Sequence, residues 1–306
     1  MTAHDEAFHD EVAAVPPPRP RVVLVDGVPM SGLAVQVQDP RGVVVAVHGG
    51  ATSSAYFDCP GQPRLSLLRS AAARGFTAIA LDRPGYGASA VYAADFADPD
   101  RRVTAAFAAV DKILGDGDRG AGLFLVGHSA GCELALRMVT ARSDVLGIEL
   151  AGTGLRYSDN AKAIISEATV TSRPAGLRDL LWQPTELYPA EVLTGALSAP
   201  GVAYEAAVTA NWARRDFPEI AARVDVPVQF SVADHESVWE STPEALGDVA
   251  ALFTNAPRVL VSTMTDSGHN LSVGLSADTY HRNVMSFIEE CIAGSQDRDH
   301  EQSEAG

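Results

Sequence analysis

Short apolar runs alternate with helix-forming stretches along most of this chain. The apolar runs are rich in valine, isoleucine and leucine and occupy residues 21–25, 33–38, 43–47, 77–81, 123–126, 145–150, 226–232 and 259–264. Helical patterns occupy residues 65–74, 104–114, 130–141 and 277–292. Several apolar runs are continuous, as in strands covered on both faces. The alternation therefore predicts an α/β fold, with a mostly parallel central sheet of about eight strands flanked by helices.

Two segments depart from this alternation of strands and helices. An Asp26-Gly27 turn joins the first two apolar runs, which predicts an antiparallel hairpin at the sheet edge. Residues 151–222 are helix-prone and contain no convincing strand pattern. We therefore expect a core built from residues 21–150 and 223–294, interrupted by a helical insertion at 151–222.

The two ends of the chain have a different composition. Residues 1–20 mix acidic residues and histidines with a run of three prolines, and residues 295–306 are almost wholly polar. Such segments bury too little apolar surface to offset the entropy of ordering. The sequence therefore predicts a disordered tail at each end.

Charge and cysteine content limit the classes of partner and the cellular compartment that we expect for this chain. The formal net charge of −16 disfavours sustained contact with nucleic acid or an anionic membrane, because both are densely negative. No stretch approaches the roughly 20 apolar residues that a membrane span needs. The acidic N-terminus lacks the features of a signal peptide, and three scattered cysteines suit reduced thiols. We expect a cytoplasmic protein with a small-molecule partner, and the sequence leaves its oligomeric state open.

A candidate nucleophile lies in a short glycine-flanked motif, Gly127-His128-Ser129-Ala130-Gly131. The motif follows an apolar run and precedes a helical pattern, which is the strand, turn and helix context of a nucleophile elbow. The glycines allow a tight turn that exposes the serine hydroxyl, and the following helix N-terminus favours developing negative charge. A buried serine in an ordinary glycine-rich turn is the structural alternative.

These features resemble the α/β-hydrolase superfamily, and the resemblance covers roughly residues 21–293. Two further turns carry it, His48-Gly49-Gly50 after the run at 43–47 and Asp82-Arg83-Pro84-Gly85-Tyr86-Gly87 after the run at 77–81. The resemblance implies an oxyanion hole formed by the backbone N–H groups of Gly50 and Ala130. It implies structural roles for His48 and for the second turn.

The resemblance also implies the chain order serine, then Asp or Glu, then histidine. His269 follows the run at 259–264 and is the expected general base. Asp234 follows the run at 226–232 and is the preferred acid, because it is the first carboxylate beyond that run. Glu236 is the main rival. Asp266 is less favoured because it lies so near His269 in sequence.

Serine at this position predicts an acyl-enzyme intermediate and, as the leading function, hydrolysis of a carboxylic ester. A thioesterase or a carbon–carbon bond hydrolase would use the same residues, and a non-catalytic ligand-binding homologue is the alternative of another class. The insertion resembles a helical cap, so Trp182, Tyr188 and Trp212 are candidate contacts for an apolar acyl substrate. No motif calls for a cofactor, and we expect no metal site, since the clusters at residues 4–6 and 9–11 suit an acidic tail.

Overall fold

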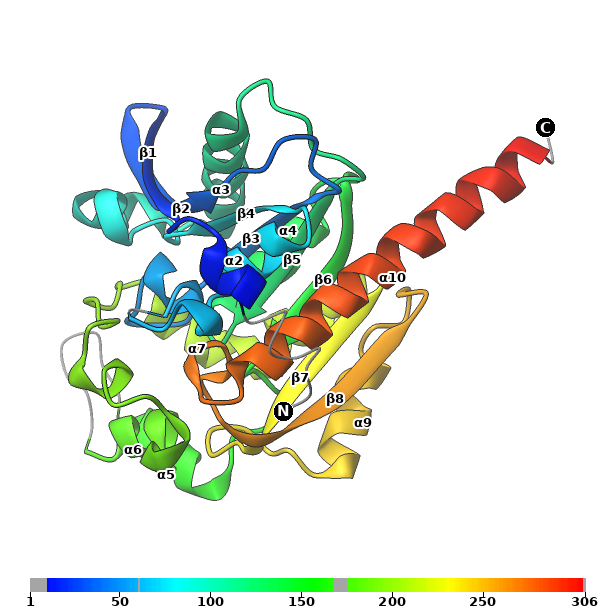
Figure 1. Ribbon diagram of the computed structural model, residues 1–306. Helices are drawn as coiled ribbons and strands as arrows, with labels where there is room; N and C mark the ends of the chain where they lie inside the picture. Colours follow the sequence, from blue (N-terminus) through cyan, green and yellow to red (C-terminus); the bar gives the residue numbers. More distant parts are fainter. Residues whose placement is uncertain (1–9, 60, 168–174, 305–306) are drawn as a thin grey trace.

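The computed structural model describes residues 10–59, 61–167 and 175–304, and side chains as far as residue 295 (Figure 1). Within this part of the chain, eight strands form one sheet. They are β1 (Arg19–Val25), β2 (Val28–Val35), β3 (Val43–Val47), β4 (Thr77–Leu81), β5 (Leu123–His128), β6 (Val145–Ala151), β7 (Val228–His235) and β8 (Val259–Gly268).

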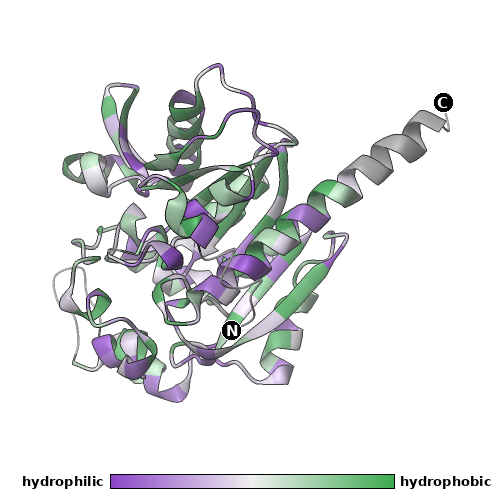
Figure 2. Ribbon diagram, in the orientation of Figure 1, coloured by the Kyte–Doolittle hydropathy of each residue, from purple (hydrophilic) through white to green (hydrophobic). Residues whose placement is uncertain are grey.

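The strand order in the sheet is β1-β2-β4-β3-β5-β6-β7-β8. β2 is antiparallel to both β1 and β4, and every other neighbouring pair is parallel. The expected hairpin is confirmed, since Val25 pairs with Val28 across the Asp26-Gly27 turn. β3, β4 and β5 are buried along their whole length, as their continuous apolar sequences indicate. Figure 2 shows the hydrophobic character of these central strands.

Helices cover both faces of the sheet. The α-helices are α2 (Leu67–Ala73), α3 (Pro99–Leu114), α4 (Gly131–Val139), α5 (Asp159–Ser166), α6 (Leu177–Trp182), α7 (Glu205–Asn211), α8 (Phe217–Ala221), α9 (Pro243–Ala251) and α10 (Ala277–Glu304). Short helical turns lie at η1 (Ser54–Phe57), η2 (Pro63–Leu65), η3 (Gly87–Phe96), η4 (Thr185–Leu187), η5 (Val192–Thr194), η6 (Trp212–Asp216) and η7 (Leu271–Val273).

The core is divided by the sheet into two apolar clusters. One cluster joins side chains of α3, α4, α8 and α9 to one face of the sheet, and the other joins α2 and α10 to the opposite face. A mostly parallel sheet with helices on both faces is the α/β architecture that the sequence predicts. The parallel strands all end at one edge of the sheet, where their following loops can meet.

The segment between β6 and β7 contains no strand among its described residues, only α5 to α8 and the short turns η4 to η6. α5, α6 and α7 gather at one end of the sheet in Figure 1. Residues 168–174, inside the expected insertion, lie outside the described residues.

Both segments expected to form tails contain helical residues where the structure describes them. Residues 10–14 are helical, the Val12 side chain is buried, and Arg69 donates a hydrogen bond to the Val15 carbonyl, so part of this segment packs on the core. Residues 1–9 lie outside the described residues. The backbone of α10 stays helical as far as Glu304 and projects beyond the sheet in Figure 1. Across the described residues, no helix has the length and apolar character needed to span a membrane.

Candidate active site

Ser129 occupies the sharp turn between β5 and α4. Its φ of +51° is in the left-handed region, which residues other than glycine adopt at a cost of order 1 kcal/mol or more. The Ser129 N–H donates to the Ala151 carbonyl at the end of β6, over 2.8 Å. The turn is thereby fixed to the neighbouring strand, and the serine side chain is left half-buried rather than enclosed.

The glycines on either side of this turn are required by close packing. A Cβ atom on Gly127 would lie 2.9 Å from the Ala135 Cβ and 3.0 Å from the Cys132 Cα. A Cβ atom on Gly131 would lie 2.3 Å from the Val47 carbonyl oxygen. α4 can therefore start directly against β3 only because position 131 has no side chain.

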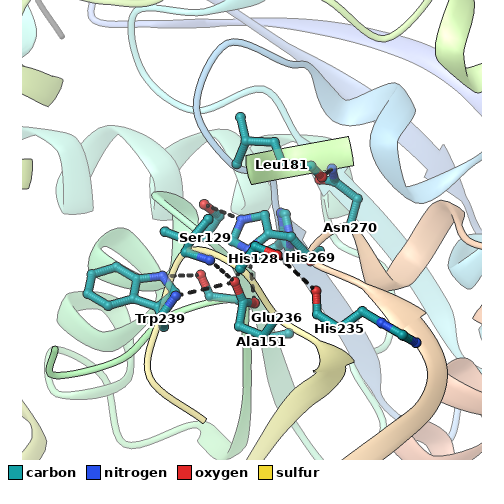
Figure 3. Close-up of polar contacts among 12 residues, drawn as sticks. His128, Ser129, Ala151, Leu181, His235, Glu236, Trp239, His269 and Asn270 are labelled. Carbon is teal, nitrogen blue, oxygen red and sulfur yellow. Dashed lines mark hydrogen bonds and ion pairs between the residues drawn. The ribbon is translucent and has the colours of Figure 1, made fainter. Parts of the chain in front are cut away.

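His269 and Glu236 complete a hydrogen-bonded chain with Ser129 (Figure 3). The His269 Nε2 atom lies 3.2 Å from the Ser129 Oγ atom, and Nδ1 lies 2.9 Å from Glu236 Oε2. The Glu236 Oε1 atom also accepts a hydrogen bond from the Val238 N–H. The His269 and Glu236 side chains are each only 1% exposed, so the imidazole is held between its two partners away from bulk water.

Asp234 does not have the position that the sequence predicted for it. Its Oδ2 and Oδ1 atoms accept hydrogen bonds from the backbone N–H groups of Asp266 and Ser267, each over 2.9 Å. The Asp234 side chain is 32% exposed and ties the end of β7 to that of β8. The expectation that Asp234 lies against His269 is therefore corrected, and its rival Glu236 has that position.

The cause of this difference is the length of β7. The expected strand ended at residue 232, whereas β7 runs to His235 through a register shift between Ala233 and His235. Asp234 is thus still inside the strand, and Glu236 is the first carboxylate beyond it. Figure 3 shows the His235 side chain directed away from His269.

The loop after β3 brings Gly50 close to Ala130. A Cβ atom on Gly50 would lie 3.8 Å from the Ala130 Cβ, so the two expected oxyanion-hole residues lie side by side at the start of α4. Across the described residues, the N–H groups of Gly50 and Ala130 take part in none of the hydrogen bonds found. Both amides are therefore available to a bound oxygen atom.

The comparison with known families agrees with this geometry, because residues 44–281 match the model of the alpha/beta hydrolase family. The matched region includes the β5–α4 turn and the loops that carry Glu236 and His269. The chain belongs to this family. No curated protein matches the chain by sequence.

Solved structures with the same fold include proteins that are named for different activities. A bacterial membrane phospholipase A has a TM-score of 0.67 and 16% identity, over 94% of this chain and 90% of its own. The thioesterase domain of the curacin biosynthetic pathway has a TM-score of 0.58 and 17% identity, over 88% and 99%. A bromoperoxidase from Bacillus anthracis has a TM-score of 0.60 and 15% identity, over 89% and 100%. At such identities the likeness concerns the fold alone.

Two further histidines of this hydrolase are buried near His269 but are held as neutral rings. His128 stacks on Tyr56, and its Nε2 atom lies 3.0 Å from the His269 carbonyl oxygen. Burial, and to a lesser extent the neighbouring His269 ring, lowers the pKa of His128 to about 3. Burial and the neighbouring Arg83 guanidinium likewise hold the pKa of His48 well below its usual range. His48 accepts a hydrogen bond from the Arg83 N–H, in keeping with its expected structural role.

The aromatic side chains proposed to contact substrate lie in different surroundings. Tyr188 is buried beside the His269 loop, where its hydroxyl accepts a hydrogen bond from the Asn270 N–H. Trp182 packs edge-on against Tyr188 and is half-buried. Trp212 is buried in the core, stacked on Phe217 and bonded through Nε1 to the Thr153 hydroxyl.

The turn after β4 has the scaffolding contacts expected of it. Asp82 accepts hydrogen bonds from the Ser31 hydroxyl and the Ser54 N–H, and a Cβ atom on Gly87 would collide with the Asp82 carboxylate. The described residues contain no group of three or more histidine, cysteine or acidic side chains placed to hold a metal ion.

Proposed function

We propose that this α/β hydrolase cleaves carboxylic esters or related acyl compounds through a Ser129–His269–Glu236 triad. The observation that supports it most directly is the continuous chain of hydrogen bonds from the Ser129 Oγ atom through His269 to Glu236. A serine hydroxyl is a weak nucleophile until a base takes its proton, and these contacts supply that base and its orienting acid.

In the proposed reaction, the Ser129 Oγ atom attacks the acyl carbon while the His269 Nε2 atom takes the hydroxyl proton. The resulting imidazolium is stabilised by the Glu236 carboxylate, which accepts the Nδ1 proton in a hydrogen bond. His269 then donates its proton to the departing alcohol oxygen, which leaves an acyl group on Ser129. Water, activated by the same imidazole, releases the acid and restores the free enzyme.

The amides of Gly50 and Ala130 are proposed to stabilise the tetrahedral intermediate. The carbonyl oxygen of the substrate gains negative charge during attack, and two preorganised N–H donors stabilise that charge more than they stabilise the ground state. The N-terminus of α4 adds a favourable field at the same place.

The substrate proposed is a small-molecule acyl compound with an apolar acyl group. Trp182 and Tyr188 supply apolar surface beside the His269 loop and are the better candidates for contact with the acyl chain. Trp212 is a weaker candidate because its ring is packed in the core. Two of the fold neighbours are named as a phospholipase and a thioesterase, and both of these activities are acyl transfers.

Labelling with a fluorophosphonate probe tests this proposal, because the probe reacts only with a serine that has an activating base. We expect the wild-type protein to be labelled once and to hydrolyse p-nitrophenyl acetate. Ser129→Ala should abolish both, while Ser166→Ala, which changes an exposed serine of α5, serves as the matched control. Far-ultraviolet circular dichroism should be unchanged in both variants.

A wild-type protein that is not labelled but binds acyl ligands would favour the non-catalytic, ligand-binding alternative. Hydrolysis of acyl thioesters in strong preference to the matching oxygen esters would favour a thioesterase. Retained ester hydrolysis in Ser129→Ala would contradict the assignment of the nucleophile.

A further inference from the structure

We propose that Glu205 is a positioning residue for the oxyanion hole. It acts through Arg83, which contacts the loop that carries Gly50. The inference rests on the proposed function of Ser129, Gly50 and Ala130, and it assigns a role to a side chain from the segment between β6 and β7. Glu205 is the first residue of α7, far in sequence from the loop after β3.

The loop after β3 is held by hydrogen bonds on both sides of the Gly50 amide. The Gly49 carbonyl accepts a hydrogen bond from the Arg83 Nη2 atom over 2.9 Å. The Ala51 N–H donates to the Tyr86 hydroxyl over 3.0 Å, and the Ala51 carbonyl accepts from the Ala199 N–H over 2.9 Å. The residues on both sides of Gly50 are thus fixed, and these contacts set the direction of its N–H group.

Part of this support comes from residues 197–205, a stretch that we call the strap. Besides the Ala199 contact, the Thr52 hydroxyl donates to the Leu197 carbonyl over 2.7 Å, and the Tyr204 hydroxyl donates to the Pro84 carbonyl over 2.7 Å. The strap therefore contacts both turns that surround Gly50, the one after β3 and the one after β4.

Glu205 joins the strap to the loop through a buried guanidinium. The Arg83 side chain is 3% exposed and Glu205 is 18% exposed, and the Arg83 Nη2 atom that bonds the Gly49 carbonyl also bonds Glu205 Oε1. Burial alone would lower the pKa of Arg83, but the Glu205 carboxylate, aided by Tyr204 and Tyr86, raises it above its usual value. One atom of Arg83 therefore connects Glu205 to the residue that precedes the Gly50 amide.

The Glu205 carboxylate also lies close to Gly50. A Cβ atom on Gly50 would lie 3.5 Å from Glu205 Oε1 and 3.7 Å from Oε2. An unpaired carboxylate there would oppose the negative charge that develops on the substrate oxygen, because like charges repel strongly in a site with little water. Its pairing with Arg83 reduces this repulsion. The same contact therefore neutralises the Glu205 charge and positions the backbone that carries the Gly50 N–H group.

The loop has a conformational reason to need this support. Ala51 has a φ of +53°, in the left-handed region, so the backbone beside the Gly50 amide is strained. Such a conformation persists only where surrounding contacts hold it. Without the strap, the loop can relax and carry the Gly50 N–H away from the position where the oxyanion forms.

The test compares Glu205→Ala with Glu205→Gln and with Glu186→Ala, which changes an exposed glutamate of the same segment. For each variant, kcat and KM for a p-nitrophenyl ester are measured, with the inhibition constant of a trifluoromethyl ketone, which forms an oxyanion on Ser129. We expect Glu205→Ala to lower kcat by about 10- to 100-fold, since an ångström of misplacement can cost that much. The inhibition constant should rise by a similar factor while KM changes little.

Glu205→Gln keeps an oxygen acceptor for Arg83 and should recover most of kcat, and Glu186→Ala should behave as wild type. A purely structural role would lower the melting temperature of Glu205→Ala without weakening ketone binding relative to substrate, and that result would overturn the inference. If Glu205→Ala does not fold, Glu205→Asp keeps the charge but shortens the side chain by one methylene, which weakens the contact with Arg83 and should lower kcat several-fold. Unchanged kcat in that variant would also overturn it.

Failure of the proposed function would look different. The wild-type protein would then show no ester hydrolysis that depends on Ser129, and no variant at Glu205 would be needed to reveal it. The positioning role fails instead when wild-type hydrolysis depends on Ser129 but Glu205→Ala matches the wild type in kcat and in ketone inhibition.

Discussion

Glu236 and Asp234 offer a direct comparison of two carboxylates two residues apart. Glu236→Gln removes the charge that balances the imidazolium of His269 and allows the ring to adopt the wrong tautomer. We expect kcat to fall by about 10³- to 10⁴-fold, by analogy with the orienting acid of serine proteases. Asp234→Asn changes only the tie between β7 and β8 and should cost less than about 10-fold. Steady-state kinetics on a p-nitrophenyl ester measures both, and a larger loss in Asp234→Asn would return the acid role to Asp234.

The sequence was sufficient to predict that Ser129 and His269 meet, because Ser129 lies in a glycine-flanked turn and His269 follows the apolar run at 259–264. The acid could not be chosen in the same way. An apolar run was taken to end with its strand, yet β7 continues through polar residues, and the register shift after Ala233 leaves no mark in the composition. Contacts between distant segments, such as Arg83 with Glu205, also have no local pattern.

The junction between β5 and α4 depends on Gly131. A Cβ atom there would lie 2.3 Å from the Val47 carbonyl and 2.5 Å from the His48 carbonyl, and neither backbone atom can move aside easily. We expect Gly131→Ala to destabilise the protein by about 1–3 kcal/mol, as overpacking commonly does, and to lower activity by displacing Ser129. Urea unfolding with a matched activity assay measures both effects.

Gly247 provides the control for that substitution. It lies inside α9 and a Cβ atom there would meet nothing within 4 Å. Gly247→Ala should therefore raise the unfolding free energy by about 0.5–1 kcal/mol and leave activity unchanged. A stabilised Gly131→Ala variant would mean that α4 does not start against β3 as described.

Strands buried on both faces were the easiest to locate from sequence. β3 and β4 have the predicted bounds, and both are buried at every position, as their short runs of mainly apolar residues indicate. β2 begins earlier than predicted, at Val28, since its register is set by the turn at Asp26-Gly27 rather than by apolar content. The short helices α5 to α8 could be predicted only as a helix-prone region, because their stability depends on packing against distant segments.

One buried acid couples the stability of the molecule to pH. Glu149 in β6 is enclosed near Ser231, Gln229 and Tyr280, and burial raises its pKa to about 8 although these polar neighbours, among them the Tyr280 hydroxyl that donates a hydrogen bond to Oε1, oppose the shift. Between about pH 4.5 and 8 the unfolded chain releases a proton that the folded protein keeps, so this group contributes stability at low pH that is lost as pH rises.

Glu149→Gln should remove this dependence. We expect the unfolding free energy of the variant, relative to wild type, to rise by a few kcal/mol between pH 5 and pH 9, because only the wild type must ionise a buried group. Urea titrations at both pH values measure it, and the difference between the two proteins cancels the titration of all other groups. If the difference in unfolding free energy between the variant and the wild type is the same at pH 5 and pH 9, the pKa of Glu149 is not raised by folding.

The order of the strands has a consequence for how activity arises during synthesis on the ribosome. Ser129 and His269 are separated by 140 positions in the chain, and the loops carrying Glu236 and His269 follow the last two strands at the sheet edge. A nascent chain therefore carries its serine long before the imidazole that activates it. We expect ribosome-bound chains that stop before β8 to be unreactive towards a fluorophosphonate, so that hydrolysis begins only after His269 has been synthesised and β8 has joined the sheet.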